Sequence, residues 1–299
     1  MSIWLASNPW LTVLYGVIVL AIIAAVAWFT PWSIALFTFR EGLRKKTLIG
    51  FLILSILVIF GSMFMTAMMY DTGGTVATDV DVKLIKDICI TAISIFGVLI
   101  AIFISAAVVP TEIENKVVYT VLSKPVRRFQ YLLGKFVGVQ IIVAVNLLLM
   151  GVLFSIALYI KEPIFPRMLL YAIFLTYFEF LIVSAFTFAV AAASTSAVLP
   201  TIAGLFIYIT GNLTQYLESV VNRSEASESA VDKTLGGLAW VLRNTLPDLQ
   251  YFSLKTQILS LQINDTPKDI QIPNLVVYGI LYALAGYIIA YWVFRRKEL

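Results

Sequence analysis

The stretch "EIENKVVYTVLSKPVRRFQYLLGK" (residues 112–135) separates two apolar runs, at about 88–109 and 132–160. Each run is long enough to cross a bilayer core of about 30 Å, which requires roughly 20 residues of α-helix. The stretch itself carries five basic residues: Lys116, Lys124, Arg127, Arg128 and Lys135. A charged segment between two membrane helices must lie on one side of the membrane, so its position constrains the placement of the rest of the chain.

The remainder of the chain repeats this alternation. Of its 299 residues, 61% are hydrophobic and 13% are charged, whereas soluble domains carry about 25% charged residues. Seven apolar segments reach spanning length, at approximately 9–30, 48–70, 88–109, 132–160, 167–192, 198–217 and 273–294. The first has no basic residue before its apolar core, and that core is too long for a signal peptide, so we interpret it as a retained helix. The sequence predicts an all-α polytopic membrane protein with about seven transmembrane helices.

Lysine and arginine predict the orientation, because cytoplasmic loops carry an excess of both. Basic clusters lie at 40–46, at 116–135 and at 295–297. The opposite loops are acidic: 71–87 is net acidic, and 218–272 has seven acidic against five basic residues. Placing all three basic clusters in the cytoplasm satisfies strict alternation. It predicts a multi-pass protein of the plasma membrane (the inner membrane of a bacterium), with its N-terminus outside and its C-terminus cytoplasmic.

The residue inventory excludes several classes of function. There is no histidine, and Cys89 is the only cysteine, which excludes His/Cys zinc sites, Ser-His-Asp and Cys-His nucleophiles, and haem held by histidine. The pair Gly134-Lys135 is not part of a P-loop, because Phe136 follows it and Phe129 replaces the first glycine. A net charge of +4 over this length makes no basic face for nucleic acid. We therefore expect neither an enzyme active site nor a bound cofactor or metal in this chain.

Residues 33–47 have the pattern of an amphipathic helix. Leu36, Phe39 and Leu43 share one helical face, and the other face carries four cations: Arg40, Arg44, Lys45 and Lys46. Such a helix can lie in the membrane interface with its cations near anionic headgroups. The alternative is an ordinary positive-inside flank. Pro31 favours a break and a new helix here.

The outer segment 218–272 begins as a polar stretch, for which we expect a loop with short helical turns. After it, leucines at 235, 238, 242 and 246 recur at helical spacing, and a second run continues from Tyr251 to Leu261. Pro247 and Asp248 separate the runs as a turn. Two helices of about 12 residues are each too short to span, so the pattern predicts a re-entrant hairpin that caps the outer end. Its defining residues are Leu238, Leu242, Pro247, Asp248 and Leu254.

The opening stretch has features that topology alone does not explain. Glu112 and Glu114 stand at the start of a plausible short helix, and Pro125 ends it. An exposed cytoplasmic helix flanked by both charge signs can dock a soluble protein. Topogenic charges would account for the cations but not for the ordered Glu-x-Glu and Ser-Lys-Pro features. We therefore predict a docking site formed by Glu112, Glu114, Lys116, Ser123, Pro125, Arg127 and Arg128.

This stretch resembles the cytoplasmic coupling segment of ABC-2 type permeases, the membrane subunits of ABC exporters. The family pattern is roughly Glu-x-Glu, a short helix, Leu-Leu-Ser-x-Pro-x-x-Arg and then Leu-Gly-Lys, and it is matched by Glu112, Glu114, Leu122, Ser123, Pro125, Arg128, Gly134 and Lys135. The stretch "FTFREGLRKKTLIG" (37–50) resembles the family's elbow helix, with Arg40, Glu41 and Arg44 in register. The stretch "TLPDLQYF" (245–252) is similar to its outer hairpin.

The resemblance covers residues 33–299 and implies a division of the chain. Residues 1–31 would form an additional transmembrane helix, and 32–299 a six-helix ABC-2 permease domain. Within that domain we expect an elbow helix at 33–47, a coupling segment at 110–131, and an outer loop and hairpin at 218–272. Val117 stands where the family often has threonine, which we expect to matter little.

The resemblance also implies partners. Two permease subunits, as a homodimer or a heterodimer, would pair with two cytoplasmic ABC ATPase subunits that bind ATP and Mg²⁺. ATP-driven closure of the ATPases would act through the coupling segment, and substrate would pass between the permeases. The additional N-terminal helix is a candidate contact for an accessory subunit. The apolar spans contact membrane lipids and favour a lipid, a peptide or another amphiphile as cargo.

A substrate path must be sought among polar residues inside the spans. Glu179 is the only charged residue near a span centre, and a buried carboxylate in a membrane suggests function. The alternative is a protonated glutamate bonded to a neighbouring helix. Thr201, Tyr208, Asn212 and Gln215 share one face of the sixth span, although polar contacts between helices would explain them nearly as well.

Three other functions compete with an exporter permease. A secondary transporter would normally show repeated halves, broken helices and several intramembrane charges. A membrane-embedded lipid-modifying enzyme needs paired acid/base groups or a metal cluster, and Glu179 stands alone. A non-transporting anchor or scaffold for an ATPase would be distinguished from a permease by ATP-dependent flux in vesicles.

Overall fold

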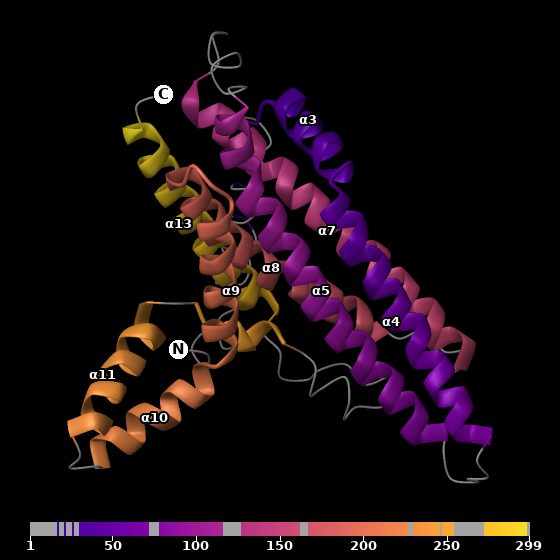
Figure 1. The fold of residues 1–299 in the computed structure, drawn as a ribbon. Helices are drawn as coiled ribbons and strands as arrows, with labels where there is room; N and C mark the ends of the chain where they lie inside the picture. The colour runs from indigo at the N-terminus through magenta and orange to yellow at the C-terminus, as the bar shows by residue number, and fades with distance from the viewer. Residues whose placement is uncertain are drawn as a thin grey trace.

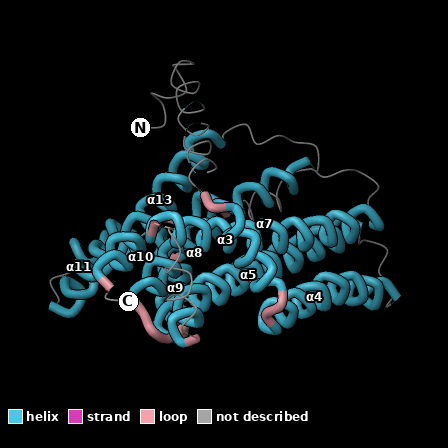
Figure 2. Tube along the Cα trace, turned by 90° about the horizontal axis from the view of Figure 1, so that it is seen from above, coloured by secondary structure: helices cyan, strands magenta, loops and turns pink. Residues whose placement is uncertain are grey.

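The computed structural model describes residues 30–71, 78–115, 127–161, 167–226, 230–245, 247–253 and 272–297, together with Val17, Ala21 and Val26. Within these residues every regular element is helical, which confirms the predicted all-α fold (Figure 2). Nearly all of the first predicted span, 9–30, lies outside the described residues, and so do 116–126 and 254–271.

The described helices follow one another along the chain as Figure 1 shows. They are α3 (Trp32–Leu43), α4 (Lys46–Asp71), α5 (Thr78–Glu114), α7 (Arg128–Lys161), α8 (Arg167–Ala193), α9 (Val198–Asn212), α10 (Thr214–Ala226), α11 (Ala230–Thr245), the 3₁₀ turn η1 (Gln250–Phe252) and α13 (Ile272–Arg296). Of these, α4, α5, α7, α8 and α13 are long and apolar enough to cross a membrane. They correspond to five of the seven predicted spans.

Helices α5 and α8 lie at the centre of the bundle. Helix α8 contacts α5, α7, α9 and α13, whereas α4 packs at the periphery against α5 and α7. Large side chains of the two central helices, such as Ile102 and Phe180, are fully buried, while Leu57 and Phe64 of α4 are exposed. Exposed leucines of this kind are normal in a membrane protein, because lipid tails are as apolar as leucine.

The elbow helix α3 packs against the first half of α7. Gly138 permits this contact, since a Cβ there would lie 2.6 Å from Thr38 Cβ and 2.8 Å from the Ala35 carbonyl oxygen. The packed face of α3 therefore consists of small residues that the amphipathic pattern did not mark. Leu36 and Leu43, on the predicted apolar face, are exposed and free to meet lipid. The helix ends at Leu43, and α4 begins only three residues later.

The predicted sixth span, 198–217, is not one helix. Helix α9 has 15 residues, and after Leu213 the chain begins α10. At 1.5 Å per residue α9 is about 22 Å long, which is less than the bilayer core of about 30 Å. For the polar stretch after 217 we expected a loop with short helical turns, whereas α10 continues there as one helix to Ala226.

The outer hairpin differs from its prediction. Its first helix exists as α11, but α11 packs against α10, and the two project together from one end of the bundle (Figure 1). Leu235 and Leu238 are 50% and 63% exposed, so the face that we expected to be covered is open. Within 234–244, the part of α11 whose side chains are described, the buried residues are Gly236 and Ala239. The second predicted helix, with Leu254, lies outside the described residues.

Candidate functional site

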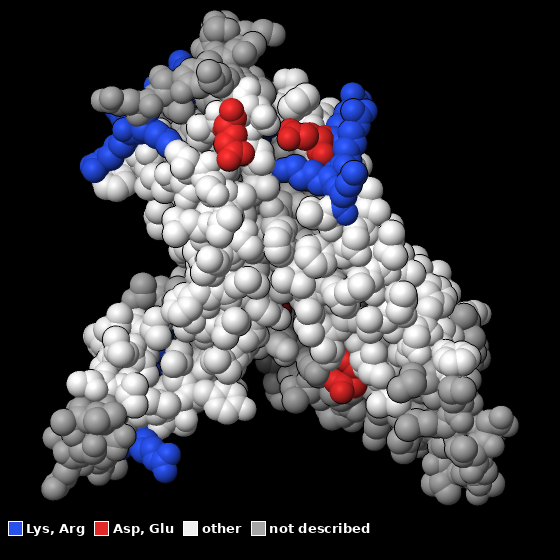
Figure 3. All heavy atoms as spheres, viewed as in Figure 1, with Lys and Arg blue, Asp and Glu red and all other residues white. Residues whose placement is uncertain are grey.

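Basic side chains gather at one end of the bundle, where α3, α5 and α13 end and α7 begins (Figure 3). The cations of 40–46, those at the start of α7 and those at the end of α13 all belong to this end. The described cations of the three predicted basic clusters therefore lie at one end of the bundle, which is what strict alternation of the spans predicts. We call this the basic end.

A buried charge cluster lies just inside the basic end. It consists of Glu112 at the end of α5, Tyr131 and Lys135 on α7, and Glu41 on α3. The Lys135 ammonium and the Tyr131 hydroxyl both donate hydrogen bonds to the Glu112 carboxylate. Glu41 Oε2 lies 3.9 Å from Lys135 Nζ. Glu112 and Lys135 are only 4% and 2% exposed, and buried charges persist only when they are paired and hydrogen-bonded.

The local sequence explains how the cluster forms. Tyr131 and Lys135 stand four residues apart on α7, so helical spacing places them on one face. Helix α5 continues through Pro110 and delivers Glu112 to that face. The prediction that Glu112 begins a separate, exposed helix is therefore wrong: Glu112 and Glu114 form the last turn of α5. The remainder of the predicted coupling helix lies in 116–126, outside the described residues.

Lys45 adds a second cation beside the cluster, in the bend between α3 and α4. Its Nζ is buried and has no hydrogen-bond partner among the described residues. Burial lowers the pKa of Lys45, and the nearby Glu41 carboxylate opposes that shift. Lys135 Nζ also lies 5.2 Å from the ring centre of Phe37, within range of a cation–π contact. The bend is thus held by electrostatic contacts with α7 as well as by small-residue packing.

The start of α7 also holds the end of α13. Arg128 Nη1 donates to the carbonyl oxygens of Arg295 and Lys297, each at 3.3 Å. Lys297 Nζ donates to the carbonyl oxygens of Ala193 and Ser194, at 3.3 and 2.9 Å. Burial lowers the pKa of Lys297. Cations are favourable at these positions, because the last carbonyls of a helix lack partners within it.

The predicted docking residues therefore divide into three groups. Glu114 and Arg127 are exposed and available to a partner. Glu112 is buried and Arg128 bonds to the end of α13, so both act inside the protein. Lys116, Ser123 and Pro125 lie outside the described residues. In the elbow helix, Arg40 is exposed, as is Arg44 in the bend that follows, whereas Glu41 approaches Lys135.

A second polar group lies near the middle of α8, around Glu179. Asn212 Nδ2 donates to Glu179 Oε1 at 3.2 Å and to the Tyr208 carbonyl oxygen at 3.1 Å. Gln250 Nε2 donates to the Asn212 carbonyl oxygen at 2.6 Å. The break between α9 and α10 is thus tied both to α8 and to η1. Among the predicted path residues, the structure brings together Glu179, Tyr208 and Asn212.

The two other predicted path residues do not join this group. Thr201 Oγ1 donates to the Ala197 carbonyl oxygen of its own helix at 2.8 Å. It lies seven positions before Tyr208, about 10 Å along the axis. The side chain of Gln215 is outside the described residues.

The segment around η1 is anchored under this polar group. Leu249 and Phe252 are fully buried, and the Asp248 backbone N–H donates to the Tyr278 hydroxyl at 2.9 Å. Asp248 Oδ1 accepts a hydrogen bond from the Gln250 backbone N–H at 3.1 Å, so a backbone donor satisfies this oxygen. Burial raises the pKa of Asp248. Pro247 and Asp248 precede the buried η1, and most of the second predicted helix lies outside the described residues.

The arrangement at the basic end fits a membrane protein driven by a soluble partner. Comparison with known families gives an independent result: the family model described as ABC-2 family transporter protein matches residues 32–299. No curated protein matched the chain. The match begins at the first residue of α3 and includes the buried charge cluster, Glu179 and every helix named above. This chain therefore belongs to the ABC-2 transporter family, as the membrane-spanning permease component of an ABC transporter.

Proposed function

We propose that this permease is the transmembrane subunit of an ATP-driven exporter, coupled to a separate cytoplasmic ATPase through residues 112–128. Membership of the family implies pairing with a cytoplasmic ABC ATPase. The observation that carries the coupling route is the buried charge cluster. It joins the two ends of the coupling segment, at Glu112 and Tyr131, to each other and to the elbow helix.

The contacts suggest how movement would pass from the ATPase into the membrane. A partner engages the exposed Glu114 and Arg127 together with the segment between them. Because Glu112 and Lys135 are bonded, α5 and α7 move together with that segment instead of sliding past each other. Arg128 extends the same connection to α13, and α13 in turn packs along α8. The displacement thus reaches α8, the helix that carries Glu179.

The remaining parts of the proposal follow from the family and the charge distribution. The basic end faces the cytoplasm of a bacterial cell, with the N-terminus outside and the C-terminus inside. ATP and Mg²⁺ bind to the ATPase and not to this chain. A second permease subunit completes the path, past Glu179, Tyr208 and Asn212, for a lipid, a peptide or another amphiphile. Residues 1–31 supply an additional helix that is available to an accessory subunit.

Charge reversal at the exposed docking residues tests the coupling route. The double variant Glu114→Lys/Arg127→Glu preserves net charge and alters no buried contact. It should insert normally but lose recovery of the ATPase or its ATP-dependent transport in proteoliposomes. Arg296→Glu is the control, because Arg296 lies at the same end and stacks only on Trp292 of its own helix, 3.6 Å from the ring centre. Normal complex recovery and transport by the double variant would place docking elsewhere.

Two further measurements separate the alternatives. The purified chain should show no saturable ATP binding, and its complex should move substrate only with ATP. A complex that assembles and hydrolyses ATP without any flux would instead indicate a scaffold. In a Cys89→Ala background, a cysteine at position 228 should react with an impermeant thiol reagent from outside, and one at position 124 only from the cytoplasm. The reverse pattern would invert the orientation.

A further inference from the structure

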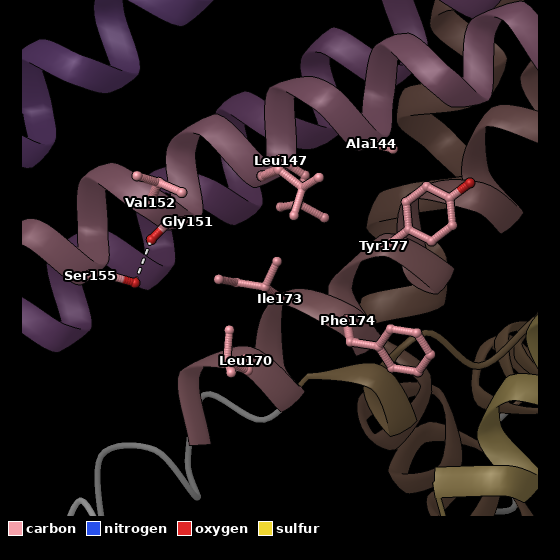
Figure 4. Close-up of a pocket in the computed structure, with 10 residues that line it drawn as sticks. Ala144, Leu147, Gly151, Val152, Ser155, Leu170, Ile173, Phe174 and Tyr177 are labelled. Atoms are coloured by element: carbon pink, nitrogen blue, oxygen red, sulfur yellow. Dashed lines mark hydrogen bonds between the residues drawn. The ribbon is translucent and has the colours of Figure 1, made fainter. Parts of the chain in front are cut away.

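A pocket lies between α7 and α8, away from both polar groups. Its volume is about 370 Å³, within the range of about 300–1,000 Å³ that is typical of ligand sites. Figure 4 shows its lining: Ala144, Leu147, Leu148, Gly151, Val152 and Ser155 from α7, and Leu170, Ile173, Phe174 and Tyr177 from α8. Small residues and two leucines of α7 form one wall, and large side chains of α8 form the other.

The lining is chemically uniform. It contains no charged residue, and the Ser155 hydroxyl is already bonded to the Gly151 carbonyl oxygen at 2.9 Å. Gly151 also brings the two helices together, since a Cβ there would lie 2.4 Å from Ile173 Cδ1. The Tyr177 hydroxyl is the other polar group of the lining, so a polar molecule could replace few of its hydrogen bonds to water here, which is unfavourable. The lining therefore favours a hydrocarbon occupant.

The position of the pocket narrows the choice of hydrocarbon. Its lining on α7 extends from Ala144 to Ser155, which is about 16 Å at 1.5 Å per residue. Half of a bilayer core measures about 15 Å. Both walls belong to spanning helices, and both lie in the half of the span remote from the basic end. The pocket thus matches the length and the depth of the acyl region of one leaflet.

We propose that this pocket binds one acyl chain of a membrane lipid from the leaflet remote from the basic end. The site is separate from the Glu179 group: Tyr177 and Glu179 stand two positions apart on α8, so their side chains leave opposite faces of the helix. The inference does not depend on ATP coupling. The acyl chain would be held by van der Waals contacts with the lining. The hydrophobic effect contributes nothing, because the chain moves from lipid and not from water.

Photolabelling of the full-length protein in lipid nanodiscs tests the site. The probe is a phosphatidylcholine with a diazirine in one acyl chain, and labelled peptides are located by mass spectrometry. Labelling of 144–155 and 170–177 should exceed that of Leu57 and Phe64, which are exposed residues of α4. Leu148→Trp should reduce labelling of 170–177 several-fold, because the larger ring occupies the pocket. Leu149→Trp is the matched control: Leu149 is also exposed but does not line the pocket.

Each outcome decides the question. Equal labelling of the pocket and α4, or equal effects of the two tryptophan variants, would overturn the proposal in favour of ordinary lipid contact. A rise in pocket labelling after deletion of residues 1–29 would identify the N-terminal segment of this chain as the occupant. Stronger labelling by a phosphatidylglycerol probe would contradict recognition through the chain alone. If Leu148→Trp does not fold, Val152→Trp serves as the filling variant and Ile156→Trp as its control.

Discussion

Removal of the cation from the buried charge cluster should destabilise this permease far more than an ordinary lysine substitution. In Lys135→Met the Glu112 carboxylate stays buried, keeps the Tyr131 hydroxyl as its hydrogen-bond partner and has only the more distant Lys45 as a nearby cation. In Glu112→Gln the consequences are milder, because Lys135 retains Glu41, whose Oε2 lies 3.9 Å from its ammonium. The two single variants of one ion pair should therefore differ in severity.

The magnitudes follow from burial. Removing one partner of a buried ion pair typically costs about 3–5 kcal/mol, and we expect Lys135→Met to fall in that range. Losing a hydrogen bond to a charged group costs about 1.5–3 kcal/mol, which is our expectation for Glu112→Gln. Replacing both partners removes both charges, and such replacements are often close to neutral. The double variant Glu112→Gln/Lys135→Met should therefore be more stable than Lys135→Met alone, because the new amide oxygen can still accept a hydrogen bond from the Tyr131 hydroxyl.

The only cysteine of the chain provides the assay. Cys89 is fully buried in α5, so a thiol-reactive fluorophore labels it only after the bundle opens. When opening and closing are fast, the labelling rate is proportional to the opening constant. Since 1.4 kcal/mol corresponds to a factor of ten, Lys135→Met should increase that rate by about a hundredfold to a few thousandfold. Lys46→Met, at an exposed lysine of the same end, is the control and should change it little.

Three results would refute this reasoning. The first is Lys135→Met labelling Cys89 at the rate of Lys46→Met, which would mean that the lysine is not buried against a carboxylate. The second is a double variant that is as unstable as the sum of the singles, which would indicate two independent contacts and no pair. The third is Glu112→Gln exceeding Lys135→Met in severity, which would leave no part for Glu41.

Three other predictions concern the remaining polar contacts. If the Glu179 carboxylate lines the path, Glu179→Gln should keep the Asn212 hydrogen bond and normal expression but lose transport. Glu179→Ala should lose transport and also reduce the yield of protein. Normal substrate flux by both variants would remove Glu179 from the path. Lys297→Met should lower the free energy of unfolding by about 0.5–1 kcal/mol in the Cys89 assay. Arg296→Met should not lower it measurably. Equal effects of the two variants would show that Lys297 makes no stabilising hydrogen bond to a carbonyl. Burial raises the pKa of Asp248, so the native state binds the carboxyl proton more tightly than the unfolded state does. Stability should therefore fall as the pH rises above about 4, the ordinary pKa range of Asp. Hydrogen exchange of 247–252 should show this pH dependence, and Asp248→Asn should abolish it.

The sequence predicts the spans well because hydrocarbon length and apolar run length are directly linked. The predicted 132–160 and 167–192 differ from α7 and α8 by only a few residues at their ends. The predicted 88–109 is too short at both ends, since α5 extends beyond the apolar window into polar residues and through Pro110. Hydropathy detects the membrane core of a helix and not the helix itself, so Glu112 was assigned to the wrong element.

The contacts of the candidate site could be predicted only in part. Lys135 carries a usable signal, because it lies inside an apolar run two helical turns after Arg128, and a lysine there needs a carboxylate partner. Nothing local identifies Glu112 as that partner across 23 positions, since the pairing depends on how α5 crosses α7. The partner of α11 escaped prediction for the same reason: its leucine spacing defines a face, but the neighbour that it meets is set by the chain path after α9.

Three neighbouring helices meet the first three turns of α7. Arg128 holds α13, Tyr131 and Lys135 hold α5, and Gly138 admits α3, so three separate helices meet within eleven residues directly after the coupling segment. A buried ion pair is not in itself a strong source of stability, because desolvation offsets most of its Coulomb energy. It does, however, penalise every register in which Glu112 and Lys135 fail to meet. The glycine contact with α3 likewise tolerates little displacement, and so does the contact of Gly151 with Ile173 of α8 further along the helix. The contacts at the start of α7 therefore favour joint movement with its neighbours, which is what the proposed transmission from a soluble ATPase requires.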